Sequence, residues 1–178
     1  MLTSLLCGIH LVVLQVWTVV KFITAYQKPL SIFRELGEAL PIKPPGGTEL
    51  LKYAPTRFAS KIMMCGRYAS VHNIANLLLL DPTYTAWLSA QKASVRTLGA
   101  TVRSIIRDDD HISGVRLVVR VFEPCVKLLR LMDGKKGATL SKVSNLLRLV
   151  DEQFAAPIDG VPEPIRVKLL GLYRGRVK

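Results

Sequence analysis

The N-terminal segment is long and apolar, and it must be buried in a protein core or in a lipid bilayer. Residues 2–23 carry one charge, on Lys21. A secretory signal would have a basic residue before this run and a small-residue cleavage site after it, and neither is present. The length suits a membrane span, but His10, Gln15 and Thr18 would each cost free energy in lipid. We therefore favour a core helix and keep a membrane anchor as the alternative.

Apolar residues recur every three or four positions through most of the remaining chain, which is the spacing of helices that bury one face. Prolines and glycines separate these stretches and mark their ends. The predicted helices cover residues 30–39, 55–80, 82–90, 93–107, 112–132 and 140–154. The run at 115–122 is rich in β-branched residues, but it continues into a longer pattern of helical spacing. The sequence therefore predicts an all-α fold.

The helix predicted at 93–107 has a clear apolar face. The residues predicted to be buried on it are Val95, Leu98, Val102, Ile105 and Ile106. The run of three aspartates at 108–110 follows, and carboxylates in that position are typical caps of the next helix. Adjacent side chains diverge, whereas a metal ion needs converging oxygens, so we predict no metal site there. We expect His111, beside the run, to be exposed.

The composition excludes several classes of protein. Of the 178 residues, 49% are hydrophobic and 21% are charged, which is enough apolar content for a core that a disordered chain lacks. The three cysteines form no C-x-x-C pair, which argues against a disulfide scaffold or a four-ligand zinc site. The sequence has no glycine-rich phosphate loop and no recognisable arrangement of nucleophile and base. We therefore predict neither a cofactor nor an enzymatic activity.

The net charge is the first positive indication of function. The chain has 25 Lys and Arg against 13 Asp and Glu, a net charge of +12. The excess is spread along the chain rather than gathered in a tail or a nuclear-import cluster. A basic surface of this kind attracts polyanions such as nucleic acids through a potential that salt weakens.

Two residue pairs are candidates for binding. Cys7 and His10 form a C-x-x-H pair one helical turn apart, but two ligands do not make a zinc site, and a packing role is favoured. Arg57 and Phe58 follow a Pro- and Gly-rich loop at 40–55, and such a pair at a helix start suits a phosphate and a stacked base. From the residues alone we favour the alternative that Phe58 lies in the core and Arg57 in solvent.

Four stretches, in this order, resemble the transposase-like proteins of the plant hAT superfamily. They are CGIH at 7–10, WTVVKFITAYQKPLSIFREL at 17–36, PTRFASKIMM at 55–64 and PCVKLLRLMDGKKGATLSKV at 124–143. The resemblance runs from about Cys7 to Phe154. The order and spacing of the four stretches make it more specific than any single motif.

The resemblance implies a fold and a chemistry. Transposases of this superfamily have an RNase H-like catalytic domain interrupted by a long all-helical insertion, and three acidic residues hold the divalent metal ions that serve DNA cleavage. Two of these acids precede the C-x-x-H motif and the third follows the insertion. The resemblance therefore implies an irregular multi-helix array like that insertion, incomplete without the flanking β-sheet parts. It also implies that the catalytic acids are absent from this chain.

The resemblance also assigns roles to the candidate residues. Cys7 and His10 match the C-x-x-H motif of the superfamily. Arg57 and Phe58 match an arginine–aromatic pair that contacts DNA at the cleavage site, where the aromatic ring stacks on a displaced base. Phe58 stands where the better-studied relatives have tryptophan, so stacking would be kept with a smaller ring.

Together these observations predict three segments and one function. Residues 1–28 are expected to form the apolar helix, 29–156 the insertion-like region, and 157–178 a basic tail with little regular structure. The chain is expected to be a non-catalytic, transposase-derived fragment, nuclear, that binds DNA weakly and without sequence preference or binds a related transposase. The alternative is a small membrane protein anchored by residues 2–23.

Overall fold

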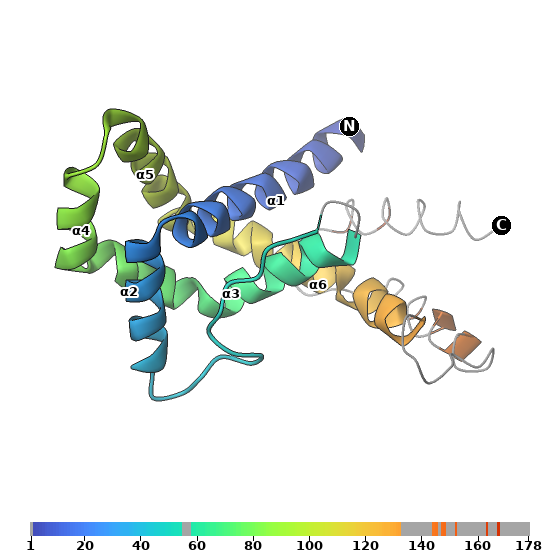
Figure 1. The fold of residues 1–178 in the computed structure, drawn as a ribbon. Coiled ribbons are helices and arrows are strands. Elements are labelled where there is room, and N and C mark those ends of the chain that lie inside the picture. The colour runs from blue at the N-terminus through green and yellow to red at the C-terminus, as the bar shows by residue number, and fades with distance from the viewer. Residues whose placement is uncertain are drawn as a thin grey trace. The chain divides into compact units, whose positions relative to one another are not determined.

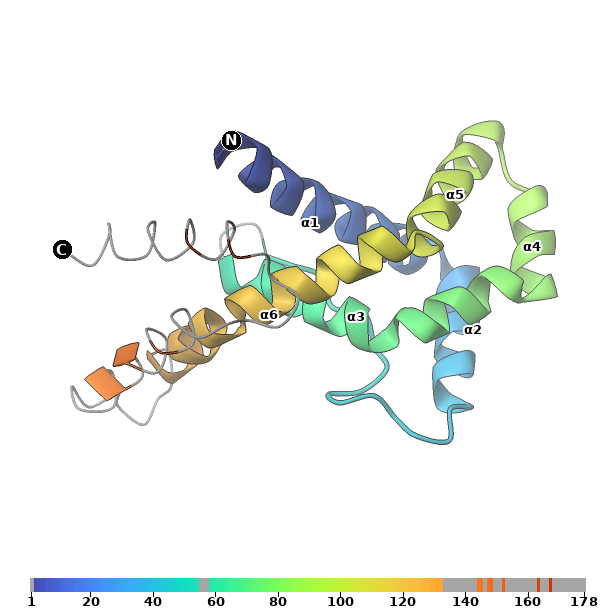
Figure 2. The ribbon, with the colours of Figure 1, turned by 180° about the vertical axis from the view of Figure 1, so that it is seen from behind.

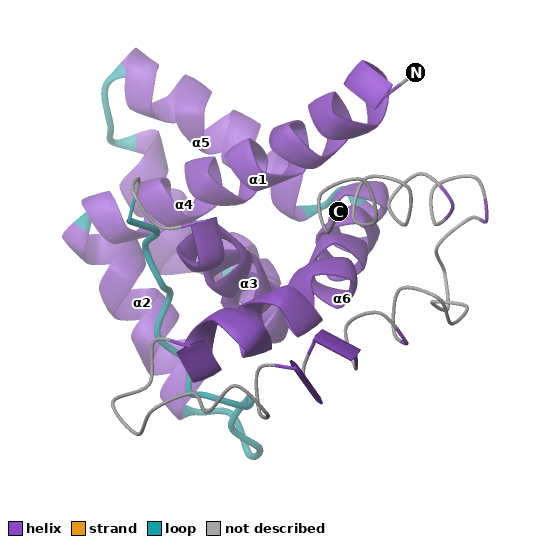
Figure 3. Cartoon of the chain, turned by 90° about the vertical axis from the view of Figure 1, so that its right-hand side faces the viewer, coloured by secondary structure: helices purple, strands orange, loops and turns teal. Residues whose placement is uncertain are grey.

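The computed structural model describes residues 2–54 and 58–132 and, beyond them, a few single positions. These positions are 144, 145, 147, 148, 152, 163 and 167. The described residues form helices and loops without a strand, which confirms the predicted all-α class (Figure 3). The chain divides into two compact units, Met1–Arg116 and Leu117–Lys178. The helix predicted at 140–154 and the tail predicted at 157–178 lie almost entirely outside the described residues.

Six helices occupy the two continuous ranges (Figure 1). They are α1 (Leu2–Ala25), α2 (Gln27–Glu38), α3 (Phe58–Leu80), α4 (Pro82–Ser89), α5 (Ala93–Ile106) and α6 (Asp109–Met132). The helices predicted from the sequence agree with α2 to α6 to within three residues at each end. The part of α6 from Leu117 onward belongs to the second unit, and the helix continues through Pro124 without a break.

Aspartates set the starts of two helices. Asp81 lies between α3 and α4, and its Oδ1 accepts a hydrogen bond of 2.9 Å from the backbone N–H of Tyr84, while Pro82 occupies the first helical position. Asp108 does the same for α6, since its Oδ1 accepts from the N–H groups of Asp110 and His111 at 3.0 and 3.1 Å. The structure thus confirms a capping role for the start of the aspartate run.

Helix α1 contributes one face to the core of the first unit, where it packs against α2, α3 and α5 (Figures 1 and 2). Val16, Val19 and Ile23 are fully buried on that face, whereas Leu11 and Leu14 on the other side are 55% and 43% exposed. The stretch Gly8–Ala25 is long and apolar enough to cross a membrane, and 33% of it is buried inside the protein. Helix α1 therefore buries a stripe rather than its whole circumference.

A polar cluster joins α1, α3 and α6 inside the first unit. The prediction that His111 is exposed was wrong, because its side chain is only 4% exposed. Its Nδ1 donates a hydrogen bond of 3.1 Å to Oε1 of Gln15, so the amide that counted against a membrane span has a protein partner. The ring of Tyr68 lies 5.9 Å from that of His111 and 5.6 Å from that of His72. His72 in turn bonds the Ile106 carbonyl through Nε2 at 2.9 Å.

This cluster predicts that acid destabilises the first unit. Burial lowers the pKa of both His72 and His111 from the usual 6.5, although Asp109 and Asp108 respectively oppose the shift. Below pH 6.5 the unfolded chain therefore binds more protons than the folded chain, so stability is greatest above that pH and falls as the pH drops through it. Thermal unfolding followed by circular dichroism at several pH values between about 8 and 5 measures this fall.

A matched pair of variants assigns the acid effect to the buried ring. His111→Gln is expected to reduce the pH dependence of the melting temperature, and the part that His72 contributes is expected to remain. His10→Gln, which replaces an exposed imidazole on α1, is expected to leave it unchanged. A native melting temperature that stays constant or rises on acidification would contradict the assignment.

Candidate nucleic-acid interface

Helix α5 and the residue that caps its C-terminus place three arginines on one side. Arg96, Arg103 and Arg107 are separated by seven and four residues, which are close to two turns and one turn of a helix. The small residues Ala100 and Ser104 lie between them on the same face and leave space between the long side chains. Arg107 itself directly follows the last helical residue and caps the helix.

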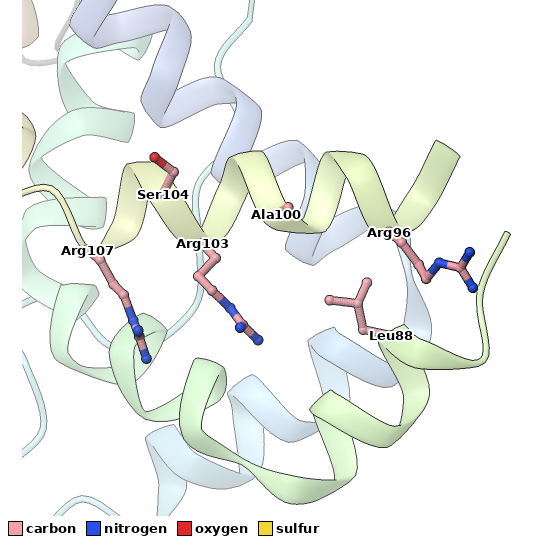
Figure 4. Close-up of a pocket in the computed structure, with 6 residues that line it drawn as sticks. All are labelled: Leu88, Arg96, Ala100, Arg103, Ser104 and Arg107. Carbon is pink, nitrogen blue, oxygen red and sulfur yellow. The ribbon is translucent and has the colours of Figure 1, made fainter. Parts of the chain in front are cut away.

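These residues line a cavity between α5 and α4. Its volume is about 390 Å³, and Leu88 of α4 closes it on the opposite side (Figure 4). In the figure Arg103 and Arg107 extend from α5 on the side of this cavity. We call this cavity the arginine groove and define it by Leu88, Arg96, Ala100, Arg103, Ser104 and Arg107.

The apolar face of α5 holds the groove in place. The buried residues of α5 are Gly99, Val102, Ile105 and Ile106. Burial of the last three confirms the prediction from the sequence. Leu98 was predicted to be buried with them, which was wrong, since its side chain is 38% exposed. The buried stripe is centred on Gly99 and Val102, and Leu98 lies at its edge.

Gly99 allows α4 to approach α5 closely. A Cβ atom at this position would lie 2.7 Å from Cδ1 of Leu88, closer than real side-chain contacts allow. The absence of a side chain at Gly99 therefore lets Leu88 pack against α5 and form the apolar wall of the arginine groove.

The groove lies in a stretch of chain without acidic residues. Residues 82–107, which form α4, the connecting loop and α5, contain Lys92 and the three arginines but no Asp or Glu. Among the described residues no carboxylate pairs with these arginines, whereas Arg34 and Lys43 pair with Glu49 and Glu38 at 2.7 and 2.8 Å.

The contacts of the groove arginines are weak. Arg96 donates one long hydrogen bond of 3.4 Å to the Ser89 carbonyl. Burial raises the pKa of the Tyr84 hydroxyl, and the positive charge of Arg103 opposes that rise, which places the guanidinium close to α4. Most N–H donors of the three guanidinium groups thus remain available to hydrogen-bond a ligand.

Such an arrangement binds anions. A guanidinium group stays charged at all physiological pH values and matches the oxygens of a phosphate with two parallel hydrogen bonds. Three of them along one helix, with no carboxylate between, suit a ligand that carries several phosphates in a row.

The structure places the predicted site residues as follows. Arg57 lies outside the described residues, and Phe58 begins α3 but its side chain is not among those described. Cys7 lies in α1, again without a described side chain, and His10 is exposed on the same helix. The contact of Arg57 and Phe58 with DNA therefore stays a prediction.

The thiol, imidazole and carboxylate groups of the described residues form no metal site. Within residues 2–54 and 58–132, no three or more His, Cys, Asp or Glu side chains group together so that they could hold a metal ion. Cys65 is fully buried in α3, and burial raises the pKa of its thiol to about 12, so it acts as a small apolar side chain.

Sequence reasoning missed the arginine groove. The spacing of apolar residues predicts the buried face of α5, but it says nothing of the side that carries the arginines. The signal was present, because the arginines at 96, 103 and 107 share a helical face and residues 82–107 contain no Asp or Glu.

Comparisons of the chain with models of protein families, with curated proteins and with solved structures found no match.

Proposed function

We propose that this chain is a non-catalytic, transposase-derived helical protein that binds DNA through its phosphates, with the arginine groove as the main contact. The observation that carries the proposal is the presence of three arginines without carboxylate partners on one face of α5. The net charge of +12 supplies a long-range attraction for the same ligand.

The resemblance to hAT transposases supports DNA over other polyanions. The four matching stretches include the first part of α3 and much of α1 and α2, which pack around the groove-bearing helices. A related transposase is a second partner under the same proposal, and the nucleus is the compartment in which both partners occur. Catalysis is not part of the proposal.

Phosphate binding predicts a steep dependence on salt. The affinity for a labelled duplex, measured by fluorescence anisotropy, is expected to fall between about 50 and 200 mM salt, with a log–log slope of about −0.9 for each phosphate neutralised. Three groove contacts give a slope of about −2.7 or steeper. Duplexes of unrelated sequence are expected to bind equally well. Absence of binding at the lowest salt concentration would overturn the proposal.

A membrane anchor in α1 is the second candidate function. It is favoured by one observation, that Gly8–Ala25 is long and apolar enough to span a bilayer. The burial of Val16, Val19 and Ile23 within the first unit supports the core-helix alternative instead. Leu14→Asp and Val16→Asp distinguish the two, since a bilayer penalises both charges, whereas a protein core penalises only the buried one.

A further inference from the structure

A second cavity of the first unit lies against another side of α4. Its volume is about 440 Å³, within the range of sites for small ligands. The residues that line it are Tyr26, Gln27, Lys28, Ser31, Trp87 and Gln91. It differs from the arginine groove in its chemistry, because it has two aromatic rings and two amides but only one cation.

The aromatic wall of this cavity is held rigidly. The ring of Trp87 lies 5.3 Å from that of Tyr26, and the two planes are tilted by 58°. Behind it, Tyr84 stacks at 6.0 Å and Phe22 meets its edge at 6.3 Å. Because Tyr84 and Phe22 are buried, they fix the indole, whose half-buried ring lines the cavity. A planar ligand would thus meet an ordered stacking surface.

The polar groups of the cavity suit the edge of a base. Gln91 donates through Nε2 to the Trp87 carbonyl at 3.2 Å, which orients its amide and leaves Oε1 as an acceptor. Gln27 is exposed, and no contact of its amide is found among the described residues. Lys28 is exposed at the rim, and Ser31 bonds the Lys28 carbonyl at 3.0 Å. A phosphate could pair with only one cation in this cavity, Lys28, whereas a base could both stack on an aromatic ring and form hydrogen bonds with the amides.

The two cavities are neighbours across α4. Trp87 and Leu88 are consecutive residues, and consecutive residues of a helix point about 100° apart, so one side chain enters each cavity. The distance between the two cavities is therefore about the diameter of a helix with its side chains, about 10–12 Å. Successive phosphates of one strand are about 3.4 Å apart along the DNA axis, so a few nucleotides are long enough to reach from one cavity to the other.

We propose that this cavity binds an unpaired base of a DNA strand whose phosphates occupy the arginine groove. The base lies against the aromatic wall of Trp87 and Tyr26, where the 58° tilt lets it stack on one ring and meet the edge of the other. The amides of Gln27 and Gln91 bond its edge, and Lys28 contacts the adjoining phosphate. The proposal rests on the proposed function, and it adds a preference for single-stranded over paired DNA.

Tryptophan fluorescence tests the proposal in the full chain. The sequence has two tryptophans, so Trp17→Phe leaves Trp87 as the sole indole emitter. Three labelled ligands of equal length are titrated: an oligothymidylate, an abasic phosphodiester and a duplex. Anisotropy of the label reports binding, and emission of Trp87 reports a base in the cavity. We expect all three to bind and only the oligothymidylate to quench Trp87.

Two controls tie the signal to the cavity. Trp87→Phe leaves Trp17 as the emitter, and its emission is expected to stay constant on titration. Lys28→Ala is expected to weaken oligothymidylate binding by about threefold to tenfold more than Lys21→Ala, which removes an equal charge from an exposed site on α1. Both lysines are exposed, so neither variant disturbs the core.

The outcomes separate the two proposals. Binding of all three ligands without quenching by the oligothymidylate would overturn the base site and leave phosphate binding intact. Equal quenching by the abasic ligand would also overturn it, since no base is then required. No binding by either readout at low salt would overturn both.

Discussion

Replacement of Arg96, Arg103 and Arg107 together by glutamine is expected to weaken duplex binding at low salt by on the order of tenfold or more. Each arginine that contacts a phosphate releases counterions, so the log–log salt slope is expected to become shallower by about 2.7. Arg96 and Arg107 are exposed and Arg103 is half-buried, and the helical propensity of glutamine is close to that of arginine. The variant should therefore melt at the native temperature.

A second triple variant serves as the matched control. Arg34, Lys43 and Lys127 are exposed and each pairs with a carboxylate, at 2.7, 2.8 and 3.0 Å. Their replacement by glutamine also removes three positive charges, so both variants have the same formal net charge. If the groove is the contact, only the groove variant loses most of its affinity. Equal losses in the two variants would show that net charge alone attracts DNA.

Charges on the two sides of α1 are expected to have opposite consequences. Val16 is fully buried, and Val16→Asp places an unpaired carboxylate in the core of the first unit, at a cost of about 4 kcal/mol or more. Domains of this size have about 5–15 kcal/mol of stability, so we expect partial or complete unfolding. Leu14 is 43% exposed, and Leu14→Asp should change stability by about 0.5 kcal/mol or less.

Circular dichroism and membrane fractionation check this pair of variants together. The two positions are two residues apart, so they would lie at nearly the same depth in a bilayer, where each aspartate costs a similar free energy. Native-like melting of Leu14→Asp beside an unfolded Val16→Asp supports a core helix. Loss of membrane association in both variants, from a native chain that sediments with membranes, would establish the anchor instead.

The helices of the first unit could be predicted because local rules decide where they begin and end. Pro82 cannot continue α3, and Asp81 caps α4, so the boundary follows from two adjacent residues. The start of α6 follows from Asp108 in the same way. These interactions reach four residues or fewer along the chain, which is why the sequence pattern was sufficient.

Contacts between distant residues account for what the sequence did not predict. His111 follows three exposed aspartates, and its burial depends on Gln15, which lies 96 residues away. The arginine groove depends on how closely α4 approaches α5 at Gly99, which no spacing in either helix encodes. The cavity proposed to bind a base likewise combines Tyr26 with Trp87, which are far apart in the sequence. Each of these features requires the packed arrangement.

Arg67 couples the Pro/Gly loop to α3. The side chain reaches from α3 to the loop and donates through Nη1 to the carbonyls of Gly47 and Glu49, at 2.7 and 3.3 Å. Gly46 has a φ of 81°, a backbone conformation that favours glycine. A Cβ atom at this position would also lie 2.7 Å from Nη2 of Arg67, so glycine leaves space for the guanidinium. Local opening of the loop must break both hydrogen bonds, so these contacts with α3 oppose that opening.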